Sequence, residues 1–132
     1  MQYMLLIYGD ENALSETERE RCYTESAEYA RGLYLKGQYL ATAPLHPTST
    51  ATSVRMRDGK RLVTDGPFAE TREQLGGFFL IEAKDLDEAV EIAAGIPAGR
   101  WGAVEIRPVV QITGLPPNSM VRPVDFVPAR ST

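Results

Sequence analysis

The chain has 132 residues, of which 43% are apolar and 24% charged, and this is the size and composition of one soluble globular domain. Its net charge of -4 without a basic block argues against nucleic acid as a partner, because binding to phosphates relies on clustered Lys and Arg. No apolar stretch approaches the length of a membrane span, and residues 1–8 lack the basic start of a signal peptide. We therefore expect a cytoplasmic protein without membrane contact.

The sequence offers no motif for a metal or a cofactor. Cys22 is the single Cys and His46 the single His, which excludes an internal disulfide and a Cys/His zinc cluster. A glycine-rich phosphate loop and a serine elbow are also missing. We expect no metal and no cofactor, and hydride and phosphoryl transfer are disfavoured.

The first predicted elements are a strand and a helix. Residues 3–8 form a continuous apolar run of strand length, typical of an inner strand. Ser15 and Glu18 have the spacing of a capping box, which predicts that a helix begins there. Gly37 is well placed to cap its C-terminal end. The stripe expected to face the core comprises Cys22, Ser26, Tyr29, Ala30 and Leu33.

A second strand and a hairpin follow. Residues 38–45 are predicted to form a strand. Pro44 and Pro47 lack an amide donor for the ladder, so they belong in an edge strand or at the end of a strand. Residues 50–57 and 60–64 flank Asp58-Gly59, and this dipeptide between two strand-like runs indicates a hairpin.

The third segment is an apolar strand over residues 77–83, followed by a helix and a last strand. Asp85 with Glu88 repeats the capping-box spacing, and Gly95 ends the helix. Residues 103–111 form the last strand, in which Pro108 predicts an edge or a bulge. The buried positions of the helix are predicted to be Leu86, Ala89, Val90 and Ala93.

Without the inserted hairpin, the order is βαββαβ, which predicts an α+β, ferredoxin-like fold whose antiparallel sheet carries both helices on one face. The other face then lacks a cover, so we expect a homodimer packed sheet against sheet. Residues 1–112 form the domain. Residues 113–132 are a Pro-rich C-terminal arm, either lying on another surface or fraying as a free end.

The loop that begins at Asp65 is the candidate functional segment. Gly66-Pro67 and Gly76-Gly77 restrict the backbone around it, and the first of these pairs presents Asp65 in one orientation. A partly desolvated carboxylate at this point could act as general acid or base. The alternative is that Asp65 accepts amides from the next residues and braces the turn.

His46 is the other candidate for proton transfer, because imidazole titrates near neutral pH; the alternative is a residue at the rim of the fold. Tyr8 and Ser26 could line a pocket between the first helix and the sheet, or simply pack in the core. The Arg side chains Arg72 and Arg107, with Arg55, could hold a ligand carboxylate, although surface pairing is the commoner role. Phe68 completes the set of candidate ligand contacts.

Residues 63–71 (VTDGPFAET) and 73–78 (EQLGGF) closely resemble the DGPF branch of the YCII-related proteins. Residues 3–8, 50–55 and 104–108 extend the resemblance over about residues 1–112. It implies a bacterial protein whose ferredoxin-like subunit dimerises into an α/β barrel. In the wider family a His and an Asp are proposed to act in a pocket; Asp65 matches the Asp, and Ser26 stands where the His is expected.

Two functions remain open at this point. The first is a cofactor-independent enzyme acting on a small acid or oxygenated ring compound, with Asp65 moving a proton. The second is a metabolite-binding or regulatory module, favoured by the resemblance because genes of this branch often neighbour those of extracytoplasmic-function sigma factors. A shared fold does not decide between them.

Overall fold

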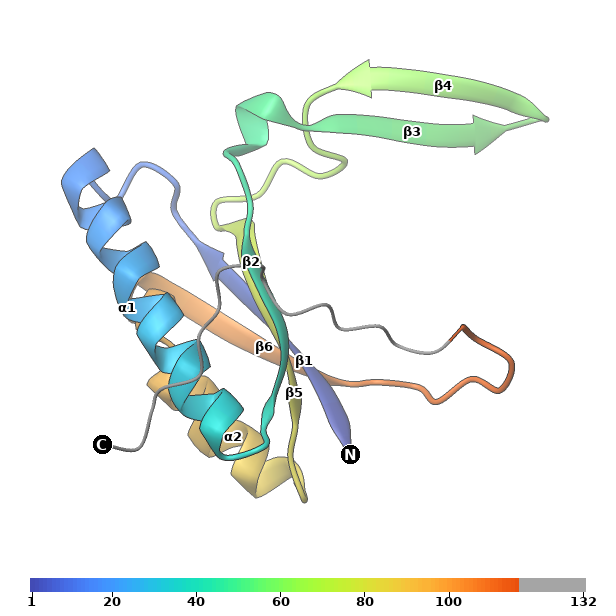
Figure 1. Ribbon diagram of the computed structural model, residues 1–132. Helices are drawn as coiled ribbons and strands as arrows, with labels where there is room; N and C mark the ends of the chain where they lie inside the picture. The colour runs from blue at the N-terminus through green and yellow to red at the C-terminus, as the bar shows by residue number, and fades with distance from the viewer. Residues whose placement is uncertain (117–132) are drawn as a thin grey trace.

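A computed structural model describes residues 1–116 (Figure 1). The residues of the expected C-terminal arm from 117 to 132 lie outside this part of the chain. The helices and strands, in chain order, are β1 (Gln2–Gly9), α1 (Glu16–Leu35), β2 (Tyr39–Pro44), η1 (Thr48–Thr50), β3 (Thr52–Arg57), β4 (Lys60–Asp65), β5 (Gln74–Glu82), α2 (Leu86–Gly95), η2 (Pro97–Trp101) and β6 (Gly102–Pro108).

Four strands form one antiparallel sheet in the order β2-β5-β1-β6. Both α-helices lie on the same side of it, which confirms the ferredoxin-like α+β fold expected from the sequence (Figure 1). The edge strands β2 and β6 end at Pro44 and Pro108, where a missing amide donor costs no ladder hydrogen bond.

The core lies between the sheet and the two helices. Leu5 and Ile81 of the central strands are fully buried, and Phe79 is 1% exposed. Tyr29 of α1 packs edge-on against Phe79, with ring centroids 6.1 Å apart, and donates its hydroxyl to the Ile92 carbonyl of α2 at 2.6 Å. This side chain therefore joins both helices to the sheet.

The predicted helix caps are present with one difference. Ser15 accepts from the Glu18 amide, and the Glu18 carboxylate accepts from the Ser15 amide, which completes the capping box of α1. The Asp85 side chain likewise accepts from the Glu88 amide. The Glu88 carboxylate, however, accepts from the amide of Lys84 rather than from that of Asp85, so the second box is not reciprocal.

Two other predictions need correction. Leu86 and Val90 of α2 are 54% and 48% exposed, and Ile92 lies in the core in their place. The helix is short, and its buried side is narrower than the apolar pattern indicated. Strand β5 begins at Gln74, three residues before the predicted start, because Gln74 and Leu75 extend the ladder to β1.

The hairpin of β3 and β4 has the predicted turn, in which Asp58 and Gly59 both have positive φ (52° and 73°), as a two-residue hairpin turn requires. It extends away from the helices and forms a separate two-stranded sheet (Figure 1). Val54 and Val63 face each other across the ladder and are 60% and 56% exposed. The face that carries them, called the apolar face below, is uncovered; Met56 also lies on it, with Arg61 and Asp65 toward its two ends.

The main sheet also has a face without helices. Tyr3 and Leu5 point toward the helices, so the alternating residues Met4 and Leu6 point to the opposite side. Their partners across the ladder are Leu80 and Phe78 of β5. All four side chains are only partly buried in a single chain.

Candidate functional site

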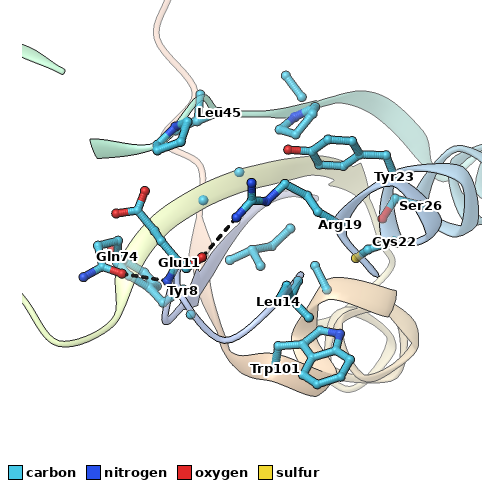
Figure 2. Close-up of a pocket in the computed structure, with 18 of the residues that line it drawn as sticks. Tyr8, Glu11, Leu14, Arg19, Cys22, Tyr23, Ser26, Leu45, Gln74 and Trp101 are labelled. Atoms are coloured by element: carbon cyan, nitrogen blue, oxygen red, sulfur yellow. Dashed lines mark hydrogen bonds between the residues drawn. The ribbon is translucent and has the colours of Figure 1, made fainter. Parts of the chain in front are cut away.

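A cavity of about 260 Å³ lies between the N-terminal half of α1, the ends of β1, β2 and β5, and η2. Its volume is slightly below the range of about 300–1,000 Å³ that is typical of ligand pockets. Its walls are largely apolar, with side chains that include Leu14, Leu45, Phe79 and Trp101 (Figure 2). Polar side chains on the same walls, among them Arg19 and His46, can orient a ligand.

Arg19 is the cation on the cavity wall. Its side chain extends from α1 toward the β1–α1 loop, where Nη2 donates to the backbone carbonyl of Glu11 at 3.0 Å (Figure 2). It is partly buried. Within residues 1–116 this is the only hydrogen bond that its guanidinium makes, and it forms no ion pair.

The Glu11 side chain holds another part of the rim. Its Oε2 accepts from the Thr48 amide at 2.7 Å, and its Oε1 accepts from the Thr48 hydroxyl. On the other side of His46, the Leu45 amide donates to the Gly76 carbonyl at 2.8 Å. The short segment that carries His46 is thus fixed at both ends, and His46 lies exposed on the cavity wall.

Cys22 and Ser26 lie one turn apart on the cavity side of α1 (Figure 2). Burial raises the pKa of the Cys22 thiol, and a hydrogen bond with Ser26 partly opposes that rise. At neutral pH the thiol is therefore protonated and a poor nucleophile.

The candidate residues fall into two groups. Tyr8, Ser26 and His46 lie together on the cavity wall. Four others, namely Asp65, Phe68, Arg72 and Arg107, do not line this cavity. Phe68 is 72% exposed beneath the Arg55 guanidinium, 4.4 Å from the ring centroid. Arg107 is exposed and bonds to Glu105 at 3.2 Å.

Asp65 is the last residue of β4 and is exposed on the apolar face of the hairpin. In the part of the chain that the structure describes, its carboxylate makes no hydrogen bond. The turn that follows is held by other groups: the Gly66 amide donates to the Ala51 carbonyl at 2.8 Å, and the Ser53 hydroxyl donates to the Gly66 carbonyl at 2.8 Å. Turn bracing is therefore not the role of this carboxylate.

Sequence reasoning missed Arg19 and Glu11. The helical spacing offered a signal for the first, because Arg19, Cys22 and Ser26 recur at intervals of three and four residues and so share one face of α1. Glu11 lies in a loop, and no local pattern links it to Thr48, 37 residues later.

Among residues 1–116, no three His, Cys, Asp or Glu side chains are grouped so as to hold a metal ion. Neither α-helix in this range is long and apolar enough to cross a membrane.

Comparison with known structures supports the fold. The chain resembles the 5-chloro-2-hydroxyhydroquinone dehydrochlorinase TftG from Burkholderia phenoliruptrix AC1100, solved in complex with 2,5-dihydroxybenzoquinone, with a TM-score of 0.52 and 17% sequence identity. The match covers 83% of this chain and 94% of TftG.

Comparison of sequences supports the family. The chain is 39% identical over 114 residues to the uncharacterized protein R00369 of Rhizobium meliloti (strain 1021), which covers 83% of this chain and 92% of that protein. The model of the YCII-related domain matches residues 1–113. This protein therefore belongs to the YCII-related domain family.

Proposed function

We propose that this protein is an enzyme that moves protons on a small oxygenated ring compound bound in the cavity between α1 and the sheet. The observation that carries the proposal is the combination of apolar walls with one imidazole and one guanidinium in a space of about 260 Å³. TftG is a dehydrochlorinase of a hydroxylated aromatic compound, and the likeness of this chain to TftG supports this class of compound by analogy only.

The apolar walls would hold the ring, and the polar groups would act on its oxygen atoms. Arg19 supplies a permanent positive charge, which favours a phenolate or enolate over its neutral form. His46 supplies an imidazole, a group that can both accept and donate a proton. The hydroxyls of Tyr8 and Ser26 lie on the same wall and offer further hydrogen bonds.

Asp65 requires a second copy of the chain to take part. It does not line the cavity of its own chain, and it shares a hairpin face with the exposed Val54 and Val63. We propose a homodimer in which the sheet faces without helices meet and the apolar hairpin face is covered by the partner copy. Exposed two-stranded hairpins are only marginally stable alone, which favours such a cover.

We also propose that the chain belongs to the bacterial DGPF branch of the family, and the motif at residues 63–71 supports this. The second function, a metabolite-binding or regulatory module of a sigma-factor system, uses the same cavity without turnover. The two functions differ in one measurable respect, which is chemical conversion of a bound ring compound.

The test uses a panel of hydroxylated quinones and hydroquinones, with and without a ring halogen. Ring-proton exchange in D₂O is followed by NMR and halide release by electrode. We expect His46→Gln to lower the rate roughly 100-fold or more, as loss of a general acid or base does. Ser49→Ala, an exposed change outside the cavity wall, is the matched control. Binding of the panel without conversion would overturn the enzyme proposal in favour of the binding module.

A further inference from the structure

The Arg19 guanidinium lines a cavity with largely apolar walls and forms no ion pair within residues 1–116, although Asp10 and Glu11 line the same cavity. Its only hydrogen bond in the described part of the chain goes to a backbone carbonyl, that of Glu11. An Arg side chain stays protonated and offers five N–H donors. Most of these donors are therefore unused in a partly buried position on the cavity wall.

The neighbouring carboxylate, that of Glu11, is bound by Thr48 and not by the Arg19 guanidinium. Both oxygens of Glu11 are occupied by Thr48, one by its amide and one by its hydroxyl. The amide of Glu11 in turn donates to the Gln74 side chain at 3.0 Å, so the backbone position of Glu11 is also fixed. Arg19 is thus held close to Glu11 by the carbonyl while its charge is left uncompensated.

The surroundings restrict what can complete the site. A charge near apolar walls is costly unless it is paired, so an anionic occupant is favoured. A guanidinium fork matches planar oxyanions in particular, because two parallel N–H donors can meet two oxygens. Leu14, Leu45 and Trp101 on the walls favour an apolar body of about the size of one ring.

We infer that Arg19 is the anion-binding group of this cavity and that its ligand is a small planar organic anion, a ring or short chain carrying a carboxylate, phenolate or enolate. This inference rests on the proposed function in one respect only, the use of the cavity as a ligand site. It names the ligand charge that the proposed reaction leaves open, and it holds whether or not the ligand is converted.

The test uses Trp101, the single Trp of the chain, which lies on the cavity wall and reports binding by its fluorescence. The probes are benzoate and its neutral counterpart benzamide, planar compounds that differ in charge but hardly in shape. We expect the carboxylate to bind roughly 10- to 100-fold more tightly than the amide, the range for a charge-assisted hydrogen bond. Equal affinity for the two probes, or no response to either, would overturn the inference.

Variants assign the preference to one residue. Arg19→Gln should bind both probes equally, and Arg19→Lys should keep part of the preference because it keeps the charge but lacks the fork. Arg21→Gln, on the exposed side of the same helix, is the matched control and should behave like the wild type. If Arg19→Gln keeps the full preference, Arg19 is not the binding group. Inorganic phosphate binding as tightly as the carboxylate would contradict the requirement for an apolar body.

The outcomes separate this inference from the proposed reaction. Charge-selective binding without conversion of the ring panel supports the anion site and overturns the enzyme. Conversion of ring compounds with equal binding of acid and amide does the reverse.

Discussion

The Glu11 carboxylate accepts two hydrogen bonds from Thr48, one from the amide at 2.7 Å and one from the hydroxyl. This pair joins the loop after β1 to the segment after β2, 37 residues away, and it fixes the chain next to His46. The position of His46 on the cavity wall therefore depends on a carboxylate that is not itself a candidate for proton transfer.

Replacing Glu11 by Gln should weaken the clamp, because a carboxamide has a single accepting oxygen and its NH2 group cannot accept the second bond from Thr48. We expect a loss of about 1–2 kcal/mol in the free energy of unfolding, measured by urea denaturation. Conversion of the ring panel should fall as well, because His46 is held less firmly. Glu16→Gln, an exposed change in the first turn of α1, should leave conversion unchanged. Full activity in Glu11→Gln would show that the clamp does not position His46.

Two glycines allow a matched test of backbone packing. A Cβ at Gly102 would overlap the Tyr8 carbonyl oxygen and lie 2.8 Å from Gly9 Cα, so Gly102→Ala must displace β1 or β6. We expect a loss of roughly 1–3 kcal/mol, the usual cost of overpacking. Gly32 lies inside α1 with nothing within 4 Å of the added methyl, and Gly32→Ala should stabilise by about 0.5–1 kcal/mol. Thermal denaturation of both variants would show opposite shifts; shifts of the same sign would contradict the model.

The Tyr29 hydroxyl predicts a stability change at alkaline pH. Burial raises the pKa of Tyr29 above its ordinary value of 10.0, so the unfolded chain loses this proton at lower pH than the folded one. The contribution is present below pH 10 and is lost as the pH rises toward the folded pKa. Tyr29→Phe should remove this dependence and cost about 1 kcal/mol at neutral pH through the lost bond to Ile92.

The measurement is urea denaturation at intervals between pH 7 and 11, with Tyr23→Phe as control, since the Tyr23 side chain is 45% exposed. An alkaline slope in Tyr29→Phe as steep as in the wild type would assign the effect to another group.

Cys22 offers a chemical test of the cavity. Because burial raises its pKa, little thiolate is present at neutral pH, and alkylation by iodoacetamide should be slower than for a free thiol peptide. Ser26→Ala removes a bond that lowers this pKa and should slow the reaction further at a given pH. A bound ring compound should protect Cys22. Alkylation as fast as in the peptide would contradict its buried position, where it is 6% exposed.

The hairpin offers a test of the proposed homodimer. Val63 belongs to the apolar face, and its chain neighbour Leu62 points to the opposite, basic face with Arg55. Val63→Asp should shift the protein toward monomer in sedimentation velocity, because a carboxylate at a covered apolar face is costly. Leu62→Asp should leave the assembly unchanged. Dissociation by both variants, or by neither, would contradict docking through this face.

The sequence was sufficient for the order of the elements, because their signals are local. The apolar run of β1, the Ser15 capping box and the Asp58-Gly59 turn each occupy a few adjacent residues, and all three are confirmed. The exposure of Leu86 and Val90 was not predictable in this way, since it depends on how far α2 tilts over the sheet.

The candidate site was predictable only in part. Tyr8, Ser26 and His46 line the same cavity. Their position was predictable because Tyr8 and His46 lie near strand ends and Ser26 lies on the inward stripe of the first helix. Arg19 was missed because a charged residue near the start of an exposed helix is usually solvated. The roles proposed for Asp65, Phe68, Arg72 and Arg107 stay predictions, since none of these residues lines the cavity of its own chain.

The ladder between β1 and β5 skips one residue: Ile7 pairs with Gly77 and Tyr8 with Leu75, which leaves Gly76 unmatched. Side chains alternate along a strand, so this single extra residue reverses the orientation of everything that precedes it in β5. Gln74, which bonds to the Glu11 amide, consequently faces inward. If Gly76 were instead paired in a regular ladder, Gln74 would point outward and lose its bond to the loop that holds Arg19, so the bulge at one glycine places the side chain that fixes this part of the cavity wall.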